Sequence, residues 1–116
     1  MLIAVVMFAS SCKKEDLPTA AEALPATWNT SDGGTITFNS NYTGTTSGSE
    51  FFEMDLGNGP IEDFTWSLDA DDNLELVYVD GSSNASIEFP VEVKAKDELF
   101  VGVDAGFINI SVTLTK

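Results

Sequence analysis

Histidine and arginine are both missing from this 116-residue chain, and lysine occurs only five times. Without histidine, the side chain that most often acts as a general base is absent. The 19 acidic residues leave a formal net charge of −14, which opposes the phosphate contacts that nucleic-acid binding needs. The composition therefore predicts a protein that is not an enzyme, does not bind nucleic acid and stays monomeric by charge repulsion. A hydrolase that used carboxylates alone, such as Glu62 and Asp63, is the alternative.

Cysteine is nearly absent too, since Cys12 stands alone in the chain. One cysteine excludes an intramolecular disulfide, and without histidine no cysteine–histidine zinc set can form. Residues 69–73, DADDN, offer the closely spaced oxygen ligands that suit calcium. The EF-hand pattern, however, needs glycine at its sixth position and glutamate at its twelfth, where this chain has Leu74 and Asp80. We therefore predict no metal site and no cofactor.

The residues around Cys12 resemble a bacterial lipobox. Residues 1–9, MLIAVVMFA, are apolar, too short to span a bilayer as a helix but as long as the apolar region of a signal peptide. Ser10 and Ser11 then lead to Cys12. The resemblance implies cleavage between Ser11 and Cys12 and a lipid anchor on Cys12. More than one acyl chain is enough for stable attachment to a membrane. The alternative is a short apolar N-terminus that contains a cysteine by chance.

The polar residues after Cys12 predict a tether. We expect a signal peptide over residues 1–11, the lipidated cysteine and a flexible linker over 12–25, and a β domain over 26–116. A positively charged start is missing before Leu2, so we expect the natural start to lie upstream of Met1. Lys14, Glu15 and Asp16 resemble a surface-export signal of outer-membrane lipoproteins, or they are a solvated linker. The expected location is therefore the cell envelope, on the periplasmic or the outer face of the outer membrane.

From residue 26 onward, apolar and polar residues alternate with the period of two that is typical of half-buried strands. Turn signals rich in glycine, asparagine and aspartate separate about eight such runs. Short connections favour an antiparallel meander. The sequence therefore predicts an all-β fold, an up-and-down eight-stranded barrel, with a flattened β-sandwich as the alternative. Pro90 lacks a donor and is expected to mark a bulge or an edge.

The pattern resembles the small lipocalin-like domains of bacterial lipoproteins. The resemblance rests on Trp28 in the first strand, on GTITFNSNYTGT (34–45), on FTWSLDADDNLEL (64–76) and on VTLTK (112–116). It implies a barrel that binds a small apolar ligand or a protein partner. Lipocalins set an arginine against the tryptophan of the first strand, and Lys116 is the residue that can take that place here.

Alternation also predicts which side chains point into the barrel. The predicted inward set is Trp28, Ile36, Phe38, Phe64, Trp66, Leu68, Leu76, Phe89, Val91, Val101, Ile110 and Val112. The candidate residues for lining a ligand cavity or the core are Trp28, Phe38, Phe52, Phe64, Trp66, Tyr78 and Phe89. Phe51, Phe52 and Met54 break the alternation, so they are expected either to line a mouth or to cap the core. An eight-stranded barrel either packs its interior or holds one small ligand, and both outcomes stay open here.

Overall fold

The structure is a computed structural model that describes residues 17–104 and 109–116. It contains one helical turn, α2 (Ala20–Ala23), and ten strands. The strands are β1 (Thr27–Thr30), β2 (Thr35–Phe38), β3 (Thr43–Ser47), β4 (Met54–Asp55), β5 (Pro60–Ile61), β6 (Asp63–Leu68), β7 (Asn73–Asp80), β8 (Ser83–Ala95), β9 (Glu98–Asp104) and β10 (Asn109–Thr115). No helix among these residues has both the length and the apolar character that crossing a bilayer requires.

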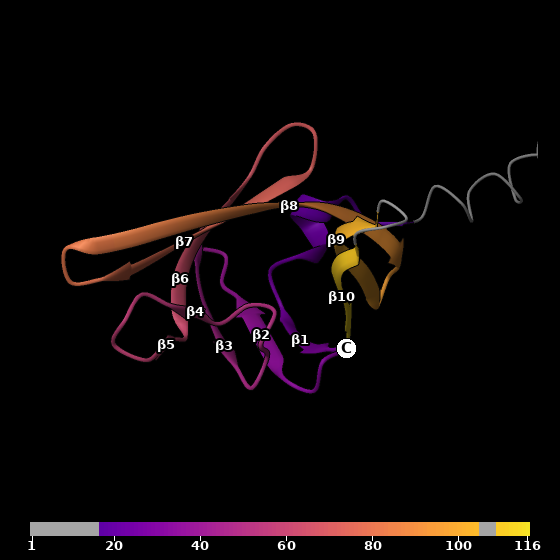
Figure 1. Ribbon diagram of the computed structural model, residues 1–116. Coiled ribbons are helices and arrows are strands. Elements are labelled where there is room, and N and C mark those ends of the chain that lie inside the picture. The colour runs from indigo at the N-terminus through magenta and orange to yellow at the C-terminus, as the bar shows by residue number, and fades with distance from the viewer. Residues whose placement is uncertain (1–16, 105–108) are drawn as a thin grey trace, which may run out of the picture.

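Eight of the strands form a closed antiparallel barrel in the order β1-β10-β9-β8-β7-β6-β3-β2 (Figure 1). Each strand pairs with the next barrel strand along the chain, and the short β4–β5 hairpin is inserted between β3 and β6. β1 and β10 close the barrel through the pairs Asn29–Thr115 and Thr30–Leu114. The predicted up-and-down eight-stranded barrel is confirmed, and the flattened sandwich is not formed.

Inward-facing residues of the strands build a single apolar core. Trp28, Ile36, Phe38, Leu76 and Val101 are all buried, which confirms most of the predicted inward set. Leu68 and Phe89 are half-buried at the margin of this core. The prediction for Ile110 is wrong, because 53% of its surface is exposed.

Ile110 has the inward parity, since Val112 and Leu114 on the same face of β10 are buried. It lies at the start of β10, where the partner is Val103 of β9. β1, on the other side of β10, pairs no further along that strand than Leu114. Ile110 therefore extends beyond the end of the barrel core. Parity identifies the face of a strand, and it does not identify where the barrel ends.

The segment expected to be a linker contributes to the core. Thr19 and Glu22 form a capping box, in which Thr19 Oγ1 accepts from the Glu22 amide at 3.2 Å and Glu22 accepts from the Thr19 amide at 3.0 Å. Ala20, Ala23 and Leu24 are buried behind this cap. The folded unit therefore includes the helical turn as well as the strands.

β7 and β8 extend beyond the rest of the barrel as a two-stranded arm, drawn in orange at the left of Figure 1. The ladder between β6 and β7 ends at Thr65–Val77, and the ladder between β8 and β9 ends at Val91–Val101. β7 and β8 continue to pair with each other as far as Asp80–Ser83. Gly81, with φ of 64°, occupies the first position of the two-residue turn, where a positive φ is required in a type II′ hairpin.

Candidate functional site

The centre of the barrel holds a buried aromatic cluster. Trp28, Phe38, Phe52, Phe64, Trp66 and Tyr78 are buried, and Phe89 is half-buried. The rings of Phe38 and Phe64 are 5.7 Å apart between centroids, those of Phe38 and Trp66 are 5.5 Å apart, and those of Phe64 and Tyr78 are 5.8 Å apart. These spacings are those of tilted and edge-to-face packing. The structure thus brings most of the predicted lining residues together as core.

The polar atoms of the cluster are all satisfied by the backbone. Trp28 Nε1 donates to the Leu24 carbonyl at 3.1 Å, and Trp66 Nε1 donates to the carbonyls of Asn39 and Thr43, both at 3.2 Å. The Tyr78 hydroxyl donates to the Phe52 carbonyl, and burial raises the pKa of Tyr78. None of these groups is left free to hold a polar ligand inside the barrel.

Phe51, Phe52 and Met54 cap the core. Phe52 is fully buried, while Phe51 and Met54 pack against the core from its margin. The Phe51 ring lies 4.8 Å from that of Phe52 and 4.8 Å from that of Phe89. Of the two expectations for this segment, capping is what the structure shows.

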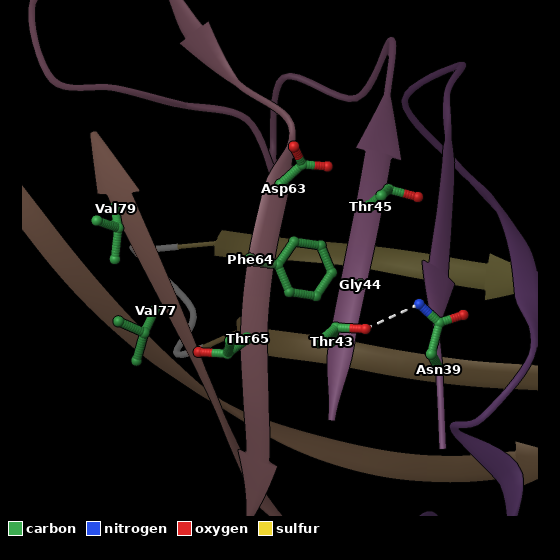
Figure 2. A pocket seen from close by; sticks show the side chains of 9 residues that line it. All are labelled: Asn39, Thr43, Gly44, Thr45, Asp63, Phe64, Thr65, Val77 and Val79. Carbon is green, nitrogen blue, oxygen red and sulfur yellow. Dashed lines mark hydrogen bonds between the residues drawn. The ribbon is translucent and has the colours of Figure 1, made fainter. Parts of the chain in front are cut away.

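A pocket of about 360 Å³ lies on the outside of the barrel, over β3, β6 and β7 (Figure 2). Its lining residues are Asn39, Thr43, Gly44, Thr45, Asp63, Phe64, Thr65, Val77 and Val79. Thr43, Thr45, Asp63 and Thr65 are exposed, as expected for the outward positions of their strands. We call this cavity the outer pocket.

The outer pocket lies where β6 and β7 separate. Asp69 donates its amide to the Asn73 carbonyl at 3.1 Å, which fixes the alternation of bonded and non-bonded pairs along the ladder. By that alternation Thr65 and Val77 are a bonded pair, and Asp63 and Val79 would be the next one. The ladder stops before reaching them. The backbone N–H and C=O groups of Asp63 and Val79 therefore face the gap.

Gly44 and Phe64 form the floor of the outer pocket. They are directly opposite each other in the β3–β6 ladder. A Cβ atom placed on Gly44 would lie 2.4 Å from Phe64 Cε1 and 2.6 Å from the Thr37 carbonyl oxygen. Only glycine allows the aromatic ring to approach the backbone this closely, and Figure 2 shows the ring lying between the two strands.

The rim of the outer pocket offers hydroxyl groups, one carboxylate and two valines. Asn39 Nδ2 donates to Thr43 Oγ1 at 3.1 Å, as drawn in Figure 2. The side chains of Thr45, Asp63 and Thr65 have no protein partner among the described residues. Hydroxyl, amide and carboxylate groups next to apolar carbon are suited to binding a ligand or a partner side chain.

Sequence reasoning missed the outer pocket because its residues are the outward members of each strand. One signal was present in LELVYVD, where Val77 and Val79 place apolar side chains at outward positions. Val79 is 62% exposed, and it stands two residues from Val77 on the same outward face. Two outward valines on one strand are therefore the feature by which the sequence marks this surface.

The DADDN segment (69–73), whose oxygen ligands would suit calcium, forms the turn between β6 and β7. Asp69 accepts from the amides of Asp71 at 2.8 Å and Asn73 at 2.9 Å, and from Asn73 Nδ2 at 3.2 Å. The hydrogen bonds from Asn73 are the main cause that lowers the pKa of Asp69. In the described parts of the chain, no group of three or more acidic or cysteine side chains is arranged to hold a metal ion.

The expected contact of Lys116 with Trp28 is present, with Lys116 Nζ 4.9 Å from the indole centroid. This distance is in the range of a cation–π interaction. The predicted cleavage and lipidation residues Ser11 and Cys12, and residues 14–16 of the predicted export signal, lie outside the described residues.

Comparison of the chain with protein-family models, with curated proteins and with solved structures finds no match.

Proposed function

We propose that this chain is a lipid-anchored, non-catalytic binding module of the bacterial cell envelope, and that it makes its contacts with the outside of the barrel. The observation that carries the proposal is the buried aromatic cluster. Its rings occupy the centre of the barrel, and their polar atoms are bonded to the backbone. A lipocalin-like carrier would need that volume for its ligand, so the filled interior favours the interaction module over the carrier.

The anchor part of the proposal rests on the sequence around Cys12. An apolar run followed by Ser10, Ser11 and Cys12 has the order of a lipoprotein signal, and acyl chains on Cys12 would hold the barrel at the outer membrane. A Cys12→Ala variant is expected to move from the membrane fraction to the soluble fraction. If this variant still sediments with membranes, the anchor is not at Cys12.

The interior is tested by native mass spectrometry of the Cys12→Ala chain after incubation with a lipid extract. We expect the mass of the polypeptide alone, because the barrel centre is occupied by side chains. A small molecule that is retained at one-to-one stoichiometry would instead identify the protein as a carrier. That outcome would leave the anchor untouched, so the two parts of the proposal fail separately.

The outer pocket is the surface where we expect contact. A Thr65→Arg change would fill it, whereas Ser67→Arg places the same side chain at an exposed outward position of β6 that does not line the pocket. Crosslinking in cells should give a product that the Thr65→Arg variant loses and the Ser67→Arg variant keeps. Equal loss, or no loss, in both variants would exclude the outer pocket as the contact surface.

A further inference from the structure

The outer edge of β8 carries a row of backbone groups that no strand of the described chain pairs with. The Val91 amide donates to the Asp72 carbonyl at 2.9 Å, so Val91 directs its backbone groups toward β7. Because bonding direction alternates along a strand, residues 83, 85, 87 and 89 also bond to β7. Asn84, Ser86 and Glu88 therefore direct their N–H and C=O groups away from β7.

Pro90 explains why β9 does not cover this edge. In the register of β8 and β9, Val91 is paired with Val101 and Glu92 with Phe100. The next pair with hydrogen bonds would join residue 90 to Gly102, and proline has no N–H to donate there. The ladder ends at Val91. Within the residues that the structure describes, the β8 edge from Asn84 to Glu88 has no paired strand.

One acidic pair lies beside this edge, on the face of the arm where Val77 is opposite Ser86 and Val79 is opposite Asn84. Glu75 of β7 lies directly opposite Glu88 of β8, as a non-hydrogen-bonded pair by the same alternation. Such pairs bring opposing Cα atoms to about 4.5 Å, and like charges at this position are destabilising. Among the described residues, neither glutamate forms an ion pair with a lysine. Lys94 pairs with Glu92 instead.

The opposite face of the same edge is apolar. Ala85, Ile87 and Phe89 alternate with the exposed residues of β8, and all three are half-buried. A strand added to this edge would place its alternate side chains beside Ile87 and Phe89 on one face and beside the Glu75–Glu88 pair on the other.

We propose that the β8 edge of the arm binds an extended segment of a partner protein by strand addition, and that this segment alternates basic and apolar residues. The three edge residues supply six backbone groups, enough to hold a strand of about five to seven residues. Lysine or arginine of the partner compensates the glutamate pair. This edge lies one strand away from Val77 and Val79 of the outer pocket, and the inference does not depend on the lipid anchor.

Amide hydrogen exchange of the full 116-residue chain tests the proposal, with an alternating lysine–valine heptapeptide as the probe. The peptide should slow exchange of the amides of Asn84, Ser86 and Glu88 at least tenfold. The amides of Ala85 and Ile87, which already bond to β7, should change less than twofold. Exchange that is unchanged at the three edge amides would overturn the proposal.

Two variants separate backbone pairing from other effects. Ser86→Pro removes an outward N–H and leaves the bonds between β7 and β8 intact, so peptide affinity should fall at least tenfold. Ser86→Ala should change it less than twofold. If Ser86→Pro does not fold, an N-methylated peptide makes the same test from the other side of the interface. Equal binding of the N-methylated and plain peptides excludes strand addition.

The charge requirement is tested with a glutamate–valine heptapeptide and with Glu88→Gln. Both changes should weaken binding, the peptide at least tenfold and the variant several-fold, and added salt should weaken binding of the lysine peptide. Equal affinity for the two peptides would exclude a basic partner. Protection of the edge that rises with protein concentration in the absence of peptide would show a second copy of the chain as the occupant instead.

Discussion

At the scale of single residues, the buried rings are positioned by their polar atoms as well as by packing. Tyr78 is fully buried, and its hydroxyl bonds to the carbonyl of Phe52 in the segment that caps the core. Tyr78→Phe keeps the ring and leaves that buried carbonyl without a partner. We expect the free energy of unfolding to fall by about 1–2 kcal/mol, measured by chemical denaturation.

Tyr42→Phe is the matched control for Tyr78→Phe. Tyr42 is 59% exposed, and its ring lies 5.0 Å from that of Trp66 between centroids. Phenylalanine keeps the ring contact with Trp66, and water takes the place of the exposed hydroxyl group. The stability should change by less than about 0.5 kcal/mol. Equal effects of the two changes would mean that the hydrogen bond to Phe52 contributes nothing specific.

Asp32 connects the β1–β2 turn to the segment before β4. It accepts from Thr30 Oγ1 at 2.5 Å, from Ser49 Oγ at 2.9 Å and from the Phe51 amide at 3.0 Å. Burial opposes ionisation, but these hydrogen bonds outweigh it and lower the pKa of Asp32 below its ordinary value of 3.8. Ser49 is buried. Asp32→Ala would leave the Ser49 hydroxyl without a partner, so the free energy of unfolding should fall by about 1–3 kcal/mol.

Acid titration provides the second measurement on Asp32. Because the pKa is lower in the folded state than in the unfolded state, the stability that Asp32 contributes is complete above pH 3.8 and is lost as the pH falls through the folded value. The stability difference between the wild type and Asp32→Asn should therefore be constant near neutral pH and shrink at acidic pH. A difference that is the same at all pH values would contradict this role.

Residue positions could be predicted from the sequence wherever alternation was regular. Trp28, Phe38 and Trp66 were found by parity, since one face of each strand is buried. Phe52 was found as a candidate, but its role as a cap depends on contacts between distant segments. Ile110 has the parity of a buried residue and is exposed, because its burial depends on how far the neighbouring strand extends. Tertiary geometry, which alternation does not encode, determines such cases.

At the scale of elements, the helical turn α2 determines where the folded unit begins. Leu24 is fully buried, and its carbonyl accepts the indole N–H of Trp28. Leu24→Ala should lower the free energy of unfolding by about 2–4 kcal/mol, as for other buried leucines. Thermal or chemical denaturation of the full chain gives the value.

Leu17→Ala removes the same side chain outside the core, because Leu17 is 43% exposed. It should change the stability by less than about 0.5 kcal/mol. Similar values for Leu17→Ala and Leu24→Ala would mean that residues 17–25 behave as a linker in solution, as the polar composition of the segment first predicted.

The strands could be predicted as elements, and their exact pairing could not. The capping box of α2 is visible as Thr19 and Glu22, three residues apart. Pro90 was expected to mark a bulge or an edge, and it lies where the β8–β9 ladder ends, while the register shift occurs between Val93 and Ala95. The arm of β7 and β8 and the outer pocket follow from ladders that end at different points along each strand. Such endings depend on neighbours that are far away in the sequence.

At the scale of the whole molecule, the chain carries a net charge of −14 and only five lysines. Mutual repulsion of the carboxylates opposes the compact state. Raising the ionic strength from about 0.01 M to about 0.1 M shortens the Debye length from about 30 Å to about 10 Å. We therefore expect the midpoint of thermal unfolding to rise over this range of sodium chloride concentration.

The Glu75–Glu88 pair supplies the control for the effect of charge. Replacing both residues by glutamine removes two negative charges that lie directly opposite each other in the β7–β8 ladder. The double variant should start from a higher midpoint at low salt and should respond less to added salt, because part of the screened repulsion is gone. A double variant with the same midpoint and the same salt response as the wild type would mean that the Glu75 and Glu88 carboxylates contribute no measurable repulsion. In that case repulsion between the two glutamates would not favour the binding of a basic strand either.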